Sequence, residues 1–320
     1  DNYIEKHEPG RSIGGFIYET ASALRDAPRF KDLKICGYVA ETDVEKQQQF
    51  AAVTVMLGEK DHFIAFRGTD SSLVGWKENM DLAYNEEIPS QKAAVRYLND
   101  ATKALPGRFT VGGHSKGGNL AVYAAAFSYK RASKNIKDVY NFDGPGFNDK
   151  VIAKDRFKDI EGRVHTLVPQ NSLIGLLLKH HEQYTVVKSS KTSGMNEHQM
   201  ISWEVGPFEA VREPDLHGQG KVLNENISEW IDSMTYQEME QFIEIIYDLV
   251  DEYGTVDEML QPKNIMAIMK SYRALNEESR KKISGVMDAL SDTIKGNIRQ
   301  YIQTGQDTVK SRFTRKGGRQ

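Results

Sequence analysis

A serine flanked by glycines is the strongest chemical signal in the sequence. The pentapeptide Gly113-His-Ser-Lys-Gly117 matches G-x-S-x-G, and it follows an apolar segment and precedes a run of small residues typical of a helix. In a nucleophile elbow the serine occupies a sharp, strained turn from strand to helix, so its neighbours must be small. A glycine-rich phosphate-binding turn is the alternative, but the G-K-[ST] run is missing. We therefore interpret Ser115 as a catalytic nucleophile.

An acyl-transfer nucleophile needs donors for the negative charge that develops on the carbonyl oxygen. The N–H of Lys116 opens the helix after the elbow and is placed to donate to this oxyanion. Upstream, Ile64-Ala-Phe-Arg-Gly-Thr-Asp70 ends a strand pattern in a polar turn. Spacing alone leaves two interpretations equally open: this turn supplies the second donor from the backbone N–H or the hydroxyl of Thr69, or it is an ordinary turn at the end of a strand.

Hydrophobic periodicity predicts the elements that position these residues. Up to about residue 215, short β-branched or aromatic runs alternate with helical patterns, which is typical of a mixed or parallel sheet with crossover helices. Strands are expected at 34–40, 49–57, 62–67, 108–113, 136–142, 163–168 and 183–189. Residues 58–61 form the expected hairpin turn. Helices are expected at 12–26, at 90–105 with Ser90 as the N-cap, and at 117–131.

The pattern changes after about residue 220, where apolar residues recur at spacings of three and four. Residues 239–253 predict an amphipathic helix with Gly254 as its C-terminal cap, and further helices are expected at 256–270 and 276–303. We therefore divide the chain into a core over 1–220, a helical region over 221–310 and a basic, flexible tail over 311–320.

Composition limits the class of protein. The 320 residues carry 42 Lys and Arg against 45 Asp and Glu, a net charge of −3 that argues against a dedicated nucleic-acid binder. A single cysteine, Cys36, excludes an intrachain disulfide and a cysteine-rich zinc module, and no metal or cofactor is expected. The longest apolar runs are too short to cross a bilayer, and no signal-peptide pattern opens the sequence. We expect a cytoplasmic protein, with leaderless secretion as the alternative.

Several motifs together resemble a known family. Phe66-Arg-Gly-Thr69, Gly75-Trp76 with Asp81-Leu82, and the elbow from Gly113 to Ala121 are similar to the class 3, fungal-type lipases of the α/β-hydrolase fold. Within that group the sequence most resembles a bacterial lipase-like family, whose motifs cover most of residues 10–210. Those motifs are Gln49-Phe-Ala-Ala52, Gly75-Trp-Lys-Glu-Asn79, His114-Ser-Lys-Gly-Gly-Asn119, Asn141-Phe-Asp-Gly-Pro-Gly-Phe147, Val168-Pro-Gln-Asn-Ser-Leu-Ile-Gly175 and His198 to Trp203.

The resemblance implies a fold class and a set of roles. The fold is expected to be α/β, an α/β-hydrolase core with a mostly parallel sheet flanked by helices and an appended C-terminal helical region. Ser115 is implied as the nucleophile, Thr69 and the N–H of Lys116 as the oxyanion donors, and a histidine near the end of the core as the base.

Chain order helps to select the base, because an α/β-hydrolase triad runs Ser, then Asp or Glu, then His. Four histidines are therefore disfavoured. His7 and His62 precede the nucleophile, His114 adjoins it and is expected to pack into the fold, and His165 lies within an apolar strand pattern. His198 matches the histidine position of the family and is the expected base. The alternatives are His217 and the pair His180 and His181.

The acid is where the sequence departs from the lipase pattern. Class 3 lipases place an aspartate after the strand that corresponds to residues 163–168, but this chain has Asn171 and Ser172 there. An asparagine can hold the tautomer of an imidazole without stabilising its charged form. Asp143, at the end of the preceding strand, is the expected acid, although its position also fits a structural turn. Asn171, Ser172 or a dyad without a third member are the alternatives.

These residues predict a serine esterase or lipase that works through an acyl-enzyme. The resemblance implies lipid or phospholipid acyl esters as substrates, with transient contact to a membrane surface. The apolar runs 73–74 and 173–178 are interpreted either as core packing, which we favour, or as an acyl-binding wall or lid. Two interpretations of the Lys116 side chain are open: it attracts an anionic head group, or it is solvated on the outer face of its helix.

Two other kinds of function stay open on the sequence. One is a lipase-fold binding or regulatory protein with weakened catalysis, suggested by the missing carboxylate at Asn171. The other is a lipase toxin whose C-terminal helices dock a protein partner. The helical region is therefore either an integral cap on the core or a docking module.

Overall fold

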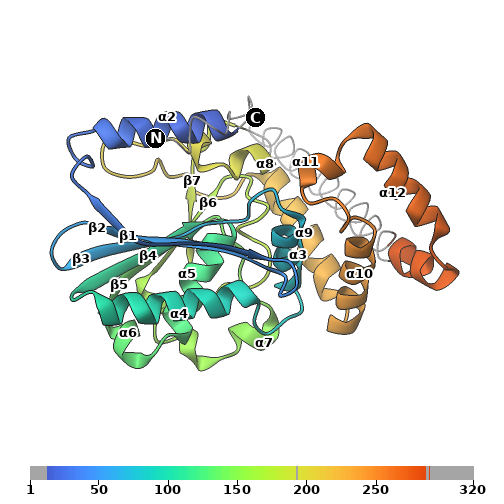
Figure 1. The fold of residues 1–320 in the computed structure, drawn as a ribbon, viewed down its shortest axis with the longest axis horizontal. Coiled ribbons are helices and arrows are strands. Elements are labelled where there is room, and N and C mark those ends of the chain that lie inside the picture. The colour runs from blue at the N-terminus through green and yellow to red at the C-terminus, as the bar shows by residue number, and fades with distance from the viewer. Residues whose placement is uncertain (1–12, 192–193, 286–287, 289–320) are drawn as a thin grey trace, which may run out of the picture.

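The computed structural model describes residues 13–191, 194–285 and 288. Seven strands form one sheet in the order in which they occur along the chain (Figure 1). Their bounds are β1 Lys34–Asp43, β2 Gln48–Met56, β3 Asp61–Phe66, β4 Arg108–His114, β5 Ile136–Phe142, β6 Val164–Pro169 and β7 Tyr184–Val187. Each strand overlaps the range predicted for it, so the strand predictions are confirmed.

The sheet is antiparallel at one end and parallel over the rest. β1, β2 and β3 are antiparallel neighbours, and the expected hairpin turn joins β2 to β3, with the N–H of Leu57 donating to the carbonyl of Asp61 at 2.9 Å. β3 to β7 pair in parallel. Because parallel strands end at the same edge of a sheet, the segments that follow β3, β4, β5 and β6 gather at that edge. These segments carry Thr69, Ser115, Asp143 and Asn171, respectively.

Helices cover both faces of the sheet. In Figure 1, α4 and α5 lie below the sheet and α2 lies above it. The helices up to residue 197 are α2 Ile13–Asp26, α3 Leu73–Asp81, α4 Pro89–Ala104, α5 Lys116–Phe127, α6 Lys130–Asn135, α7 Asp149–Ile152 and α8 Gly194–Glu197. Short 3₁₀ turns cover Asp155–Phe157, Glu161–Arg163 and Met200–Ser202. The main core lies between α4, α5 and strands β2 to β5.

Two helix ends differ from the prediction. α4 begins at Pro89 with Ile88 as its N-cap, since proline suits the first helical position, and Ser90 therefore lies inside the first turn. α5 ends at Phe127 because the backbone of Ser128 is extended, and the rest of the range predicted up to 131 belongs partly to α6.

The C-terminal helices are α9 Gly218–Asp232, α10 Tyr236–Asp248, α11 Val256–Met259 and α12 Pro262–Ala274. α10 is the expected amphipathic helix, but it ends at Asp248, so Gly254 is not its cap. The helix expected at 256–270 is broken in two, because Pro262 cannot donate to a preceding turn and starts α12 instead. Residues 277–285 are helical; most of the remainder of 276–303, and the tail over 311–320, lie outside the described residues.

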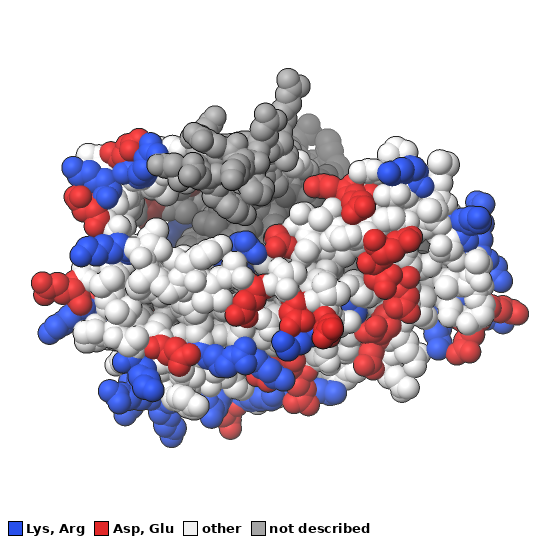
Figure 2. All heavy atoms as spheres, viewed as in Figure 1, with Lys and Arg blue, Asp and Glu red and all other residues white. Residues whose placement is uncertain are grey.

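Charge is unevenly distributed over the surface. In Figure 2, acidic side chains gather over the C-terminal helices at the right of the view, and basic side chains gather at the lower left, where Figure 1 places α6. The small net charge of the sequence therefore combines separate acidic and basic regions.

Candidate active site

Ser115 lies on the turn from β4 to α5 with φ 58° and ψ −132°. This conformation is strained for a residue with a side chain, and it presents Ser115 at the carboxyl edge of the sheet. A Cβ atom on Gly117 would collide with the carbonyl oxygen of Phe66, so glycine is required where the helix passes the end of β3. The backbone conformation predicted for a nucleophile elbow is therefore present.

Asp143 follows the neighbouring strand in the same position. His114 pairs with Phe142 in the register between β4 and β5, and the N–H of Ser115 donates to the carbonyl of Phe142 at 3.0 Å. Ser115 and Asp143 thus follow directly after paired residues of adjacent strands. Asp143 also has a positive φ, 52°, and its side chain is fully buried.

Asp143 makes two contacts with its carboxylate. Oδ2 lies 2.7 Å from Nδ1 of His198, and Oδ1 accepts a hydrogen bond from the hydroxyl of Ser172 at 2.5 Å. The first contact fixes the orientation of the imidazole and leaves Nε2 as its other nitrogen. The structure therefore brings Asp143 and His198 together, and it places Ser172 behind the carboxylate instead of beside the imidazole.

Asn171 lies against the residue before the histidine. Its side-chain amide donates to Oε1 of Glu197 at 2.7 Å, and its backbone N–H donates to Oε2 at 3.0 Å. The carbonyl of Glu197 accepts from the indole of Trp203 at 2.8 Å. Glu197 is fully buried and anchors the segment that carries His198 to the end of β6. Sequence reasoning missed Glu197; its position next to His198 was the only signal.

His114, whose ring is expected from the sequence to pack into the fold, contacts the same imidazole. Its ring lies 4.4 Å from the ring of His198, centroid to centroid, and its Nε2 lies 2.6 Å from the carbonyl oxygen of His198. Burial, and then the neighbouring His198, lower the pKa of His114 to about 4. His114 is therefore neutral at neutral pH, and its Nε2–H can donate to that carbonyl.

The two predicted oxyanion segments lie beside the elbow. A Cβ atom on Gly68 would come within 3.3 Å of the Cβ atom of Ser115, so the turn that leads to Thr69 runs directly past the serine. The hydroxyl oxygen of Thr69 accepts from the amide of Asn79 at 2.6 Å, which leaves the hydroxyl proton available to another acceptor. Lys116 is the first residue of α5, and the first N–H groups of a helix have no intrahelical partner.

The side chain of Lys116 is buried, so both sequence interpretations of it are wrong. It does not reach solvent, where a head group would have to be met; its ammonium donates to Oε2 of Glu78 at 2.8 Å and to the carbonyl of Gln49 at 2.6 Å. Burial lowers the pKa of Lys116, and the carboxylate of Glu78 opposes this shift. Glu78 and Gln49 both fall in motifs noted in the sequence, but nothing local showed that they meet.

The other histidines among the described residues have partners outside this cluster. His180 pairs with Glu182 at 3.3 Å and His181 with Glu161 at 3.1 Å. His217 is the residue before α9, and its N–H donates to the carbonyl of Gln170. His62 contacts the carbonyl of Pro106, and His165 contacts Asp138. His7 lies outside the described residues.

An apolar cavity of about 300 Å³ opens beside Ser115. Its lining combines residues from the core with residues from α9 and α10. They are Trp76, Asn79, Met80, Leu82, Ala83, Ser115, Lys116, Pro145, Ile174, Leu177, Leu178, Ile227, Trp230, Ile231, Met239, Phe242 and Ile243. Of the two apolar runs, 173–178 thus contributes to a cavity wall, whereas Leu73 and Val74 are buried in α3.

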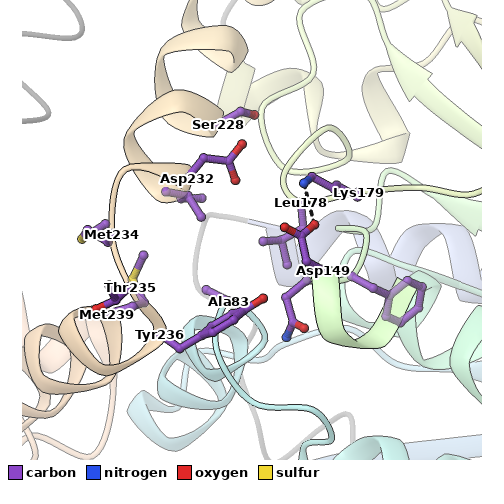
Figure 3. A pocket seen from close by; sticks show the side chains of 13 residues that line it. Ala83, Asp149, Leu178, Lys179, Ser228, Asp232, Met234, Thr235, Tyr236 and Met239 are labelled. Carbon is purple, nitrogen blue, oxygen red and sulfur yellow. Dashed lines mark ion pairs between the residues drawn. The ribbon is translucent and has the colours of Figure 1, made fainter. Parts of the chain in front are cut away.

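A second cavity of about 350 Å³ adjoins the first and is more polar. The two share the wall formed by Ala83, Leu178, Ile231 and Met239. Figure 3 shows Lys179 and Asp149 paired on one side of it, at 2.5 Å, and Asp232 and Ser228 on α9 at the other side. The cavity beside Ser115 is therefore lined mainly by apolar residues, and charged residues line the second cavity, farther from Ser115.

The C-terminal helices are attached to the core by polar contacts as well as by apolar packing. Lys77 on α3 pairs with Glu244 on α10 at 2.8 Å. The N–H of Leu73 donates to the carbonyl of Gly254 at 3.1 Å, and the N–H of Val256 donates to the carbonyl of Ser71 at 2.9 Å. The segment that follows Thr69 is thus bonded to the segment that follows α10.

The mostly parallel sheet flanked by helices, with the sharp turn from β4 to α5, is an α/β-hydrolase fold of the lipase-like type. A family model described as Mbeg1-like matches residues 24–248, and the chain belongs to this family. No curated protein matches the sequence.

The solved structures that are similar to the chain include two lipases and an esterase. M37 lipase is 16% identical with a TM-score of 0.36, over 52% of this chain and 64% of that lipase. A fungal lipase in complex with an inhibitor is 18% identical with a TM-score of 0.37, over 54% of this chain and 74% of that one. Naproxen esterase (carboxylesterase NP) from Bacillus subtilis is 10% identical with a TM-score of 0.31, over 59% and 93%. The chain thus spans less than two thirds of M37 lipase.

Two further observations concern the described residues alone. No group of three or more His, Cys, Asp or Glu side chains among them is arranged to hold a metal ion. None of the helices within them combines the length and the apolar character that crossing a membrane requires.

Proposed function

We propose that the protein is a serine hydrolase that cleaves carboxylic esters with an apolar acyl group. The observation that carries this proposal is the buried contact between Asp143 and His198 at the edge where Ser115 occupies its strained turn. A nucleophile, a base and a group that orients the base are the minimum set for acyl transfer through a covalent intermediate.

The proposed reaction has two half-reactions. The hydroxyl oxygen of Ser115 attacks the ester carbonyl carbon while Nε2 of His198 takes the hydroxyl proton, and the carbonyl oxygen becomes an oxyanion that accepts from the N–H of Lys116 and from Thr69. The imidazolium then protonates the leaving alcohol, and an acyl-enzyme forms. Water attacks this ester with the same proton transfers and releases the carboxylic acid. Asp143 stabilises the imidazolium in both halves.

The cavity beside Ser115 supports an apolar acyl group as the part of the substrate that is recognised. Ligand pockets of this size bind largely through apolar lining with a few polar groups, and the lining here is mostly aliphatic and aromatic. We propose lipid or phospholipid acyl esters as the substrate class.

The C-terminal helices are, in this proposal, an integral cap. α9 and α10 supply Ile227, Trp230 and Phe242 to the cavity that contains Ser115, and Lys77 and Glu244 connect α10 to α3. A module that only docked a partner would have no reason to supply residues to the cavity beside Ser115.

Hydrolysis of p-nitrophenyl esters from acetate to palmitate tests the proposal. The wild-type protein is expected to turn over at least one ester, and Ser115→Ala is expected to lower kcat by on the order of 10⁶-fold. Ser133→Ala, on α6 at the opposite edge of the sheet, is the matched control and is expected to retain full activity. An equal rate for wild type and Ser115→Ala on every ester would refute the proposal and favour a lipase-fold binding protein.

A further inference from the structure

The residue that follows Ser115 in the elbow, Lys116, takes part in a buried ion pair. The ammonium of Lys116 donates to Oε2 of Glu78 at 2.8 Å, to the carbonyl of Gln49 at 2.6 Å and to Oε1 of Gln49 at 2.9 Å. The side chains of Lys116 and Glu78 are both 0% exposed. All three ammonium protons therefore have an acceptor.

The carboxylate of Glu78 is equally well satisfied. It accepts from the N–H of Gln49 at 3.1 Å, from the N–H of Ser90 at 2.8 Å and from the hydroxyl of Ser90 at 2.6 Å. Buried ion pairs are costly to desolvate, and apolar side chains of similar volume often serve stability as well or better. Stability alone therefore gives little reason to place this pair here.

The position of the pair gives a different reason. Lys116 is the residue whose backbone N–H is the proposed oxyanion donor of the elbow, and Glu78 is next to Asn79 on α3. Asn79 donates to the hydroxyl oxygen of Thr69 at 2.6 Å. Two consecutive residues of α3 thus hold the two segments that carry the oxyanion donors.

Such a connection matters because the donors come from distant parts of the chain. Oxyanion donors act only when each lies about 2.7–3.1 Å from the oxygen, and a displacement of about 1 Å can cost 10²-fold in rate. The N–H of Lys116 belongs to α5, whereas Thr69 belongs to the turn after β3. β3 and β4 are paired up to Phe66 and Gly113, and the contacts of Glu78 and Asn79 add a link between the two segments beyond those strand ends.

We propose that the Lys116–Glu78 ion pair, together with Asn79, sets the spacing between the two oxyanion donors. The inference rests on the proposed function. The side chains of Lys116, Glu78 and Asn79 are positioning residues that act through Thr69 and the backbone N–H of Lys116. The motifs that carry Gln49, Glu78 and Lys116 are far apart in sequence and meet in this one cluster.

Steady-state kinetics of Lys116→Met, Glu78→Gln and the double variant on one p-nitrophenyl ester test the inference. Each single variant is expected to lower kcat by about 10- to 100-fold with KM changed less than about threefold, because the donors act on the transition state. The double variant is expected to lose no more than the worse single variant, since it leaves no unpaired buried charge. Losses that multiply in the double variant would show that the two side chains act independently and would overturn the inference.

The pH profile separates positioning from general loosening of the site. The acid limb of kcat/KM is expected at the same pH in every variant, since the pair does not touch the contact between Asp143 and His198. Glu182→Gln is the matched control, because that carboxylate is also buried but contacts Thr166 and His180. Equal losses of kcat in this control and in Glu78→Gln would overturn the inference.

Asn79→Ala covers the case in which the single charge variants do not fold, since Asn79 is only partly buried and uncharged. It is expected to lower kcat by roughly tenfold with an unchanged melting temperature. If folded Asn79→Ala or folded Lys116→Met retains the kcat of the wild type, the inference is overturned and the proposed function is unaffected. Absence of Ser115-dependent turnover in the wild type overturns the proposed function and the inference with it.

Discussion

His198 Nδ1 lies 2.7 Å from Oδ2 of Asp143, although the two residues are 55 positions apart in the sequence. The contact joins the end of β5 to the segment after β7, across the end of β6. Ser172 follows β6, where class 3 lipases place an aspartate, and its hydroxyl donates to the same carboxylate of Asp143.

Asp143→Asn is expected to lower kcat/KM for a p-nitrophenyl ester by about 10⁴-fold, because an amide stabilises the wrong imidazole tautomer and not the imidazolium. Ser172→Ala removes one hydrogen bond to the carboxylate and is expected to cost only roughly tenfold. An Asp143→Asn variant within tenfold of wild type, or a larger loss in Asn171→Ala, would assign the acid elsewhere.

His114 is expected to make stability depend on pH. Its pKa is about 4 in the folded protein and near 6.5 when unfolded, so between these values the unfolded chain binds more protons. The free energy of unfolding therefore rises with pH, and a contribution of about 3 kcal/mol at neutral pH is lost as the pH falls from 6.5 toward 4.

Urea unfolding of wild type and His114→Gln at pH 7.5 and pH 4.5 measures this contribution. The difference in unfolding free energy between the two pH values is expected to be about 2.5 kcal/mol smaller in the variant. The same pH dependence in both proteins would mean that His114 is not held neutral by the fold.

Leu177→Trp is expected to narrow the cavity beside Ser115 and to shift the ester preference toward short chains. Since each methylene in an apolar pocket changes specificity by about 10-fold or more, kcat/KM for octanoate should fall at least tenfold while acetate stays within about twofold. Met266→Ala, an exposed residue of α12, is the control. An equal loss on acetate and octanoate would place the acyl chain outside this cavity.

Local patterns were sufficient to predict the sheet and the elbow. Ser115 lies between glycines that a sharp turn demands, and the strands are short apolar runs bounded by turn residues. α3 was not predicted, because Lys77, Glu78 and Asp81 are buried in it, and inward-facing charges remove the apolar stripe that marks a helix.

Non-local contacts explain what the sequence left open. The choice between Asp143 and Asn171 depends on which strand end reaches His198, and periodicity carries no information on that distance. Nothing in the sequence around Lys116 indicates that its side chain is buried. It is a buried cation because α3, β2 and the elbow come together around it. The apolar spacing continues on both sides of Pro262, so it indicates one helix where the structure has a break between α11 and α12.

The reactivity of Ser115 toward an alkyl fluorophosphonate, located by mass spectrometry of the labelled peptide, tests the central claim most directly. The account predicts stoichiometric labelling of Ser115 in the wild type, a much slower reaction in His198→Ala and Asp143→Asn, and none in Ser115→Ala. Folded wild-type protein that remains unlabelled at Ser115, or that is labelled equally fast without His198, would contradict it.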